Sequence, residues 1–222
     1  MIGLYGGTFD PVHLGHLHAG RSVCAELGLT RLRMLLSARP GHRDAPSAPA
    51  AARWAMLCLA CAEHPMLVPD DLEILRAARQ AAPSYTVDTL LALRRAHPDA
   101  PLLWVVGSDA LAGLPTWHRW RAVPELAHLV VLQRPGAVLP QSGPVGELLA
   151  ARRVETAAPE LRSAPAGAIV VLELEMLPIS ATAVRDALTA GAPVDKLLPS
   201  AVNTYIQQHR LYGVRGDPGK TA

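Results

Sequence analysis

The 222-residue chain is poor in cysteine, aromatic residues and net charge, and each shortage argues against a class of protein. Three cysteines are an odd number, which argues against a disulfide framework. Cys58 and Cys61 form a CxxC pair, but the pair lies in an apolar helical run and no second pair follows, so we interpret both as buried small residues rather than a metal or redox site. A net charge of +2 with only 4% aromatic residues gives little support to nucleic-acid binding.

Long hydrophobic runs are also missing. No apolar run reaches about 18 residues, so we expect no membrane-spanning helix. We expect no secretory signal, because the first predicted strand begins at Met1. The predicted location is therefore the cytoplasm. Half of the residues (50%) are hydrophobic, which at this length permits one substantial core.

Short apolar segments alternate with helical ones along the chain. The apolar segments lack the polar–apolar alternation of a half-exposed sheet, which predicts an α/β fold: a Rossmann-like, doubly wound parallel sheet with helices on both faces. We expect one domain over 1–212, with a helical C-terminal portion from about 180 to 212 and a flexible tail over 213–222. The expected strands are 1–5, 30–37, 66–68, 102–106, 128–133 and 168–173. The expected helices are 14–27, 50–63, 86–96, 145–152, 180–189 and 199–210, with 70–75 as a strand extension or turn.

The most informative stretch follows the first strand and has the sequence GGTFDPVHLGH. Gly6 and Gly7 are predicted to form a tight turn that lets the backbone approach a ligand. Asp10-Pro11 signals entry into a helix. His13 and His16 then lie three residues apart on one face of the first helical turn. Because a helix N-terminus attracts anions, this pattern predicts a phosphate site that is neither a P-loop nor a dinucleotide fingerprint.

A zinc site built from the histidines of this helix is a poor alternative. His18 is rotated away from the face that carries His13 and His16, and no cysteine or carboxylate lies at ligand spacing. We therefore expect no metal held by protein side chains. The other alternative is a glycine turn followed by solvated histidines.

A second anion site is predicted near the C-terminus, in the sequence ISATAVR. Ser180 and Thr182 offer hydroxyl and backbone donors at a predicted helix start, and Arg185 lies one turn further on. The alternative is an ordinary capped helix with a surface arginine. In a parallel sheet this segment lies at the same edge as the opening motif, where ligands bind.

Both motifs resemble known signatures. The opening stretch is similar to that of the nucleotidyltransferase superfamily, which transfers AMP or CMP, and the second to the segment that binds ATP phosphates in its adenylyltransferase branch. The sequence SYTVDTL, at 84–90, resembles the segment of the nicotinate-nucleotide adenylyltransferase family. Further similarity lies in 40–43, 114–118 and 198–212. Two positions depart from the family pattern: Gly41 replaces a proline, and Ala181 replaces the commoner serine and removes one hydroxyl.

The resemblance implies an enzyme that transfers AMP from ATP to nicotinate mononucleotide, with Mg²⁺ carried mainly by the ATP phosphates. It implies no nucleic-acid or membrane partner and leaves room for a homo-oligomer. The implied catalytic residues are His13, His16 and Arg185. The implied ATP ligands are Gly6, Gly7, Thr8, Phe9, His16, Gly107, Asp109, Ile179, Ser180, Thr182 and Arg185. The implied ligands of nicotinate mononucleotide are Thr8, His42, Arg43, Thr86, Trp117, His118 and Arg134.

The chemistry of the acceptor agrees with part of this set, since a pyridine ring needs a flat partner that Trp117 can supply. Its carboxylate needs donors, which Thr86 and the backbone near His118 could give. The alternatives are a core tryptophan and, for His42 and Arg43, solvated loop charges. Two other functions stay open from the sequence: the same transfer to nicotinamide mononucleotide or pantetheine phosphate, and a non-catalytic nucleotide sensor.

Overall fold

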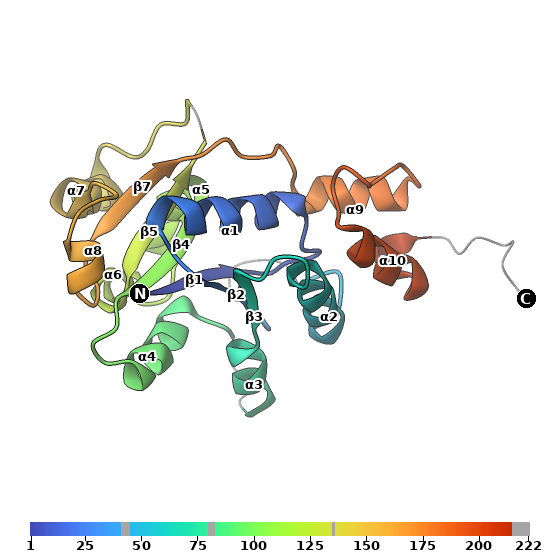
Figure 1. The fold of residues 1–222 in the computed structure, drawn as a ribbon, viewed down its shortest axis with the longest axis horizontal. Helices are drawn as coiled ribbons and strands as arrows, with labels where there is room; N and C mark the ends of the chain where they lie inside the picture. Colours follow the sequence, from blue (N-terminus) through green and yellow to red (C-terminus); the bar gives the residue numbers. More distant parts are fainter. Residues whose placement is uncertain (41–44, 80–82, 135, 215–222) are drawn as a thin grey trace, which may run out of the picture.

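The computed structural model describes residues 1–40, 45–79, 83–134 and 136–214 (Figure 1). Seven parallel strands form one sheet in the order β3-β2-β1-β4-β5-β7-β6. The strands are β1 (Ile2–Gly7), β2 (Leu32–Leu36), β3 (Leu67–Asp70), β4 (Leu102–Gly107), β5 (His128–Gln133), β6 (Arg153–Val154) and β7 (Ile169–Glu173).

Helices connect the strands and continue after the last one. The α-helices are α1 (Leu14–Leu27), α2 (Ala50–Cys61), α3 (Leu72–Arg79), α4 (Thr86–Ala96), α5 (Ser108–Ala112), α6 (Val123–Leu126), α7 (Gly143–Arg152), α8 (Glu160–Ser163), α9 (Ala181–Thr189) and α10 (Ser200–Gln208). Three short 3₁₀ turns are η1 (Leu114–Thr116), η2 (Trp120–Ala122) and η3 (Leu211–Gly213). None of the helices in the described part of the chain combines the length and hydropathy needed to cross a bilayer.

Strand β4 shows why the sheet needs helices on both faces. Its side chains are buried on either side, and they alternate between two hydrophobic clusters. Leu103 and Val105 pack with residues of α1, α2, α9 and α10. Leu102, Trp104 and Val106 pack with residues of α4, α5, α6 and α7. In Figure 1, α1 and α4 accordingly lie on opposite sides of the sheet. The predicted doubly wound α/β fold is confirmed.

The order of the strands also locates the ligand crevice. From β1 the chain proceeds outward through β2 and β3, and then returns to pair β4 with the other edge of β1. This reversal is a topological switch point, at which ligands bind beyond the carboxyl ends of the strands. The segments after β1 and β4 flank that point.

Most predicted elements match the structure, including the ends of two helices. Ser180 caps α9 by accepting a hydrogen bond from the backbone N–H of Ala183 (3.1 Å). Gly28 ends α1 with a left-handed backbone, φ 62°. Both features depend on residues within one turn, and local sequence therefore predicts them well.

Two expectations were wrong, and one short strand was not expected. Gly6 and Gly7 are the last residues of β1 rather than a turn. Residues 72–79 form helix α3 rather than a strand extension or turn, and its one buried residue is the polar Glu73. The two-residue strand β6 is too short to leave a sequence pattern. The N-cap of α4 is Tyr85, and the hydroxyl of the preceding Ser84 accepts a hydrogen bond from the backbone N–H of Arg39 (3.3 Å). The tail was predicted over 213–222: Gly213 belongs to the turn η3, and residues 215–222 lie outside the described part.

Candidate active site

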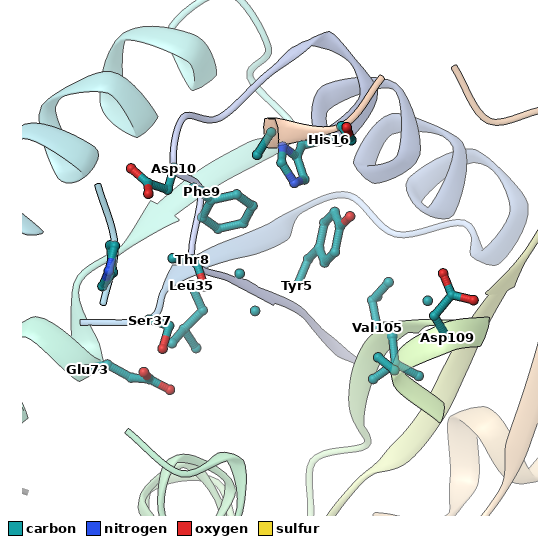
Figure 2. A pocket seen from close by; sticks show the side chains of 18 of the residues that line it. Tyr5, Thr8, Phe9, Asp10, His16, Leu35, Ser37, Glu73, Val105 and Asp109 are labelled. Atoms are coloured by element: carbon teal, nitrogen blue, oxygen red, sulfur yellow. The ribbon is translucent and has the colours of Figure 1, made fainter. Parts of the chain in front are cut away.

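A cavity of about 1280 Å³ opens at the switch point, over the ends of β1, β2 and β4 (Figure 2). One end is bounded by the loop after β1 and the start of α9, and Trp117 lines the cavity as well. The residues of the predicted site that line it are Gly6, Gly7, Thr8, Phe9, His16, Gly107, Asp109, Trp117, Ser180, Thr182 and Arg185. The two anion-binding motifs, separated in the sequence by more than 160 residues, therefore share one cavity.

The two histidines of the opening motif stack on each other but occupy different environments. Their ring centroids lie 3.7 Å apart with an interplanar angle of 28°. His16 lines the cavity, next to the rings of Phe9 (5.0 Å) and Tyr5 (6.3 Å). His13, the N-cap residue of α1, is 5% exposed and does not line the cavity. Burial lowers the pKa of His13 to about 4, so its ring is neutral near pH 7.

The backbone of this motif determines which nitrogen of His16 carries the proton. The N–H of His13 donates to Nδ1 of His16 over 3.2 Å. An imidazole nitrogen that accepts a hydrogen bond carries no proton, so the neutral ring is protonated at Nε2. His16 is therefore arranged as a hydrogen-bond donor through Nε2.

The glycines of the motif make room for rings rather than for a turn. A Cβ atom on Gly7 would lie 2.7 Å from the ring of Phe9, and one on Gly6 would lie 2.8 Å from the ring of Trp104. Gly15 lies between the two histidines, where a Cβ atom would come within 3.0 Å of Nδ1 of His13. The unusual backbone belongs to Phe9, whose φ is 46° and whose side chain is buried. Glycine is therefore needed at positions 6 and 7 because aromatic rings pack against the backbone there.

Helix α9 brings the second motif to the same loop. The guanidinium of Arg185 donates from Nη1 to the carbonyl oxygen of Asp10 (2.9 Å) and from Nη2 to the Thr182 hydroxyl (3.4 Å). Ser180, at the start of this helix, lines the cavity beside them. A guanidinium, two hydroxyls and a helix N-terminus on one side of a cavity provide a complementary surface for a polyphosphate.

The cavity is also lined by Ser37 after β2, Glu73 of α3 and Trp117 after η1. The backbone of Ser84 donates to the carbonyl of Arg39 (2.8 Å), which joins the loop after β2 to the start of α4. The rings of Tyr85 and His118 stack with centroids 4.4 Å apart. This contact brings the residue before Thr86 against the residue after Trp117. Two segments predicted to receive the acceptor therefore lie together.

Comparison with known proteins assigns the chain to a family. The family model of cytidylyltransferase-like proteins matches residues 4–187. A protein of Pseudomonas paraeruginosa is 45% identical over 212 residues, covering 95% of this chain and 96% of the relative. A protein of Stenotrophomonas maltophilia is 47% identical over 212 residues, covering 94% and 95%. Both carry the name "Probable nicotinate-nucleotide adenylyltransferase". The chain belongs to the nicotinate-nucleotide adenylyltransferase family.

Solved structures agree with this assignment at the level of the fold. The nicotinic acid mononucleotide adenylyltransferase of Plasmodium falciparum, complexed with NaAD, superposes with a TM-score of 0.72 at 15% identity, covering 96% of this chain and 98% of that one. The same enzyme complexed with APC superposes with a TM-score of 0.70. The family resemblance predicted from the sequence motifs is confirmed.

Some residues predicted for the site of this adenylyltransferase do not line the cavity. Ile179 packs against the core cluster under α1, as the residue before the α9 cap. Thr86 is the first residue of α4, His118 is exposed, and Arg134 is exposed beyond the end of β5. His42 and Arg43 lie outside the described residues. The structure thus gathers the predicted ATP ligands more completely than the predicted acceptor ligands.

Arg53 was not predicted from the sequence, and its side chain holds together the loops that follow β1 and β2. Its guanidinium is 1% exposed and donates to the carbonyl oxygens of Thr8 (2.7 Å), Ser37 (2.8 Å), Ala38 (3.0 Å) and Ala48 (3.1 Å). Burial lowers the pKa of Arg53, and the nearby Asp10 opposes that shift. The sequence did contain a signal: Arg53 lies on the apolar stripe of α2 with the buried residues Met56, Leu57, Ala60 and Cys61.

Glu73 was also missed and had no recognisable sequence signal. This buried carboxyl lines the cavity from α3, as Figure 2 shows, and accepts a hydrogen bond from the Thr89 hydroxyl (2.7 Å). Burial raises its pKa, while the hydroxyls of Thr89 and Ser84 act in the opposite direction. Glu73 thereby links α3 to α4 at the wall of the cavity.

Proposed function

We propose that this protein transfers AMP from ATP to nicotinate mononucleotide, forming nicotinate adenine dinucleotide and pyrophosphate. The observation that carries the proposal is the convergence of both anion-binding motifs in one cavity whose lining also includes an aromatic residue, Trp117. Identities of about 45% over nearly the whole chain to proteins named for this activity support the choice of acceptor.

In the proposed reaction, an oxygen of the mononucleotide 5′-phosphate bonds to the α-phosphorus of ATP. The bond from that phosphorus to the oxygen bridging to the β-phosphate breaks, and pyrophosphate leaves with the electron pair. The attacking phosphate is already an anion, so the reaction needs neither a protein nucleophile nor a strong base. Catalysis then rests on positioning the two phosphates and stabilising their charge.

His16 is proposed as the donor to the charge that develops on the transferred phosphate. Its Nδ1 accepts a hydrogen bond from the backbone N–H of His13, so the neutral ring carries its proton on Nε2, and the residue lines the cavity. His13 is proposed to act by stacking, since its buried ring holds His16 from behind. Thr8, Ser180, Thr182 and Arg185 are proposed to hold the ATP phosphates. Gly6, Gly7, Phe9, Gly107, Asp109 and Ile179 are proposed to form the remaining ATP subsite.

The acceptor is proposed to bind on the side of Trp117, whose indole would stack on the pyridine ring. Thr86 and the backbone near His118 would meet the nicotinate carboxylate. Thr8, His42, Arg43 and Arg134 are proposed as its phosphate ligands. No nucleic acid or membrane takes part in this proposal.

The donor set around the phosphates fits a magnesium ion carried by the substrate. Within the described residues, no three His, Cys, Asp or Glu side chains gather as a metal site. The carboxylate of Asp10, which lines the cavity, already accepts three hydrogen bonds. Mg²⁺ commonly keeps several waters and binds through phosphate oxygens, where it neutralises their charge. The chain's own part is to hold those phosphates through Arg185, Ser180 and Thr182.

The decisive experiment measures pyrophosphate release with ATP and each of three acceptors: nicotinate mononucleotide, nicotinamide mononucleotide and pantetheine phosphate. We expect turnover with nicotinate mononucleotide and a dinucleotide product of the corresponding mass. Faster turnover with either of the other acceptors would identify that compound as the substrate and contradict the proposed acceptor. Binding of ATP without turnover on all three would indicate a nucleotide sensor and contradict the enzyme proposal.

A further inference from the structure

The C-terminal turn η3 lies against the loop that follows β1. The hydroxyl of Tyr212 donates a hydrogen bond to Oδ1 of Asp10 over 2.8 Å, across 202 residues of sequence. The Tyr212 backbone is left-handed, with φ 57°, and its carbonyl lies 3.0 Å from the hydroxyl of Thr189 on α9. Thr189 also lies 2.9 Å from the carbonyl of Arg185. The position of Tyr212 is thus tied to the helix that carries the proposed phosphate ligands.

Asp10 needs such a partner because it is an anion on the wall of a phosphate site. Its side chain is 6% exposed, and its carboxylate accepts hydrogen bonds from the backbone N–H groups of Ser47 (2.6 Å) and Ala48 (3.1 Å). The Tyr212 hydroxyl is the third donor. Hydrogen bonds to a carboxylate stabilise its charge and limit its repulsion of another anion. Without the hydroxyl, Asp10 would be less firmly held where it faces the triphosphate.

The same residue also orients Arg185. While the Asp10 carboxylate accepts from Tyr212, the Asp10 backbone oxygen accepts from Nη1 of Arg185 (2.9 Å). The charged groups near this point are Asp10, Arg185 and the buried Arg53, and the first two line the cavity. Burial and the charge of Asp10 raise the pKa of Tyr212, which keeps its hydroxyl protonated as a donor.

We propose that Tyr212 is a positioning residue for ATP: acting through Asp10, it holds the loop after β1 and Arg185 in the arrangement that receives the triphosphate. This inference rests on the proposed function in that ATP is the ligand. It assigns a role in nucleotide binding to the last described turn of the chain, which contributes no residue to the lining of the cavity.

The test compares Tyr212→Phe, which removes only the hydroxyl, with Tyr205→Phe as a matched control. Tyr205 lies in the neighbouring helix α10, where its ring is tilted by 35° against that of His209, with the ring centroids 4.1 Å apart. We expect Tyr212→Phe to raise both the Kd of a non-hydrolysable ATP analogue and the KM for ATP about three- to tenfold, as for residues that act through a neighbour. The KM for nicotinate mononucleotide should stay unchanged, and the melting temperature should fall by a few degrees, as expected for the loss of one hydrogen bond to a buried carboxylate. Tyr205→Phe should leave all four quantities unchanged.

A double-mutant cycle with Asp10→Asn separates positioning from general destabilisation. If Tyr212 acts through Asp10, Tyr212→Phe should raise the Kd by a smaller factor in the Asp10→Asn background than in the wild type. Equal factors in both backgrounds, or an unchanged Kd in Tyr212→Phe, would overturn the inference. Since analogue binding needs no acceptor, a wild-type chain that binds the analogue without turnover would contradict the proposed function and still decide the role of Tyr212.

Discussion

His13 and His16 stack at 3.7 Å, yet only His16 lines the cavity. The relationship divides a two-histidine motif into one ring that lines the cavity and one buried ring. His13 contributes its backbone N–H and its flat face, and His16 contributes Nε2–H. The roles of the two histidines are therefore separable by mutation.

Replacement of His16 by alanine should lower kcat by about 10²–10³, because one donor to transition-state charge is lost. Steady-state pyrophosphate release measures the change. His18→Ala is the matched control on the same helix, since the His18 ring lies against the Glu175 carbonyl (2.8 Å) and not in the cavity. Near-normal turnover of folded His16→Ala enzyme would contradict the catalytic role.

Gly15→Ala should impair catalysis through the histidine pair. The new Cβ atom would lie 3.0 Å from Nδ1 and 3.1 Å from Cε1 of the His13 ring, so the stack must shift. Since small displacements of a catalytic group are costly, we expect kcat to fall about tenfold or more. Gly113→Ala, where the nearest atom lies 3.6 Å away, should behave as the wild type. Equal kcat values for the two variants would show that the stack tolerates the methyl group.

Trp117→Ala should weaken acceptor binding and leave ATP binding intact. Stacking of an aromatic side chain on a ring ligand contributes about 1–3 kcal/mol, so the KM for nicotinate mononucleotide should rise about 5- to 100-fold. Trp120→Ala is the control, because that indole lies under the guanidinium of Arg121 (4.6 Å) rather than in the cavity lining. A rise in the KM for ATP alone would show that Trp117 contacts ATP rather than the acceptor, which would contradict the prediction.

Arg53→Met should destabilise the protein by about 3 kcal/mol or more, because four buried carbonyl oxygens lose a charged donor. Urea unfolding at pH 7.5 gives the free energy. Arg21→Met, at an exposed position of α1, should change it by less than about 0.5 kcal/mol. Similar free energies of unfolding for the two variants would contradict the structural role of Arg53.

Acidification should destabilise the fold through buried neutral histidines. Burial lowers the pKa of His13 to about 4 and also lowers that of His128, whose ring bonds the backbone of Ala164 and Ala168. Unfolded histidine binds a proton near pH 6.5, so the unfolding free energy falls as the pH drops from about 7 toward 4.

The slope should reach about 1.4 kcal/mol per pH unit for each such ring. Urea unfolding of the wild type and of His128→Asn at several pH values between 7.5 and 5 measures it. In the variant, the unfolding free energy should depend less steeply on pH, because one of the two buried histidines is missing. Parallel curves would mean that His128 does not contribute to the acid sensitivity.

The amino-acid sequence determined the features that depend on neighbours within a few residues. The alternation of apolar strands and helices predicted the doubly wound sheet, and Ser180 predicted the start of α9. These succeed because caps, periodicity and helix dipoles are local. Where local rules were applied to Gly6 and Gly7, they failed, since those glycines accommodate the Trp104 and Phe9 rings.

Only the tertiary structure decided which groups meet across the chain. Arg53 finds its acceptors in segments separated from it by up to 45 residues, and Tyr212 reaches Asp10 across 202. Such contacts depend on how the whole sheet and its helices pack, because a hydrogen bond between distant segments has no periodicity or spacing in the sequence. The sequence therefore determined the chemistry available to the cavity, and packing decided which side chains line it and which hold its loops in place.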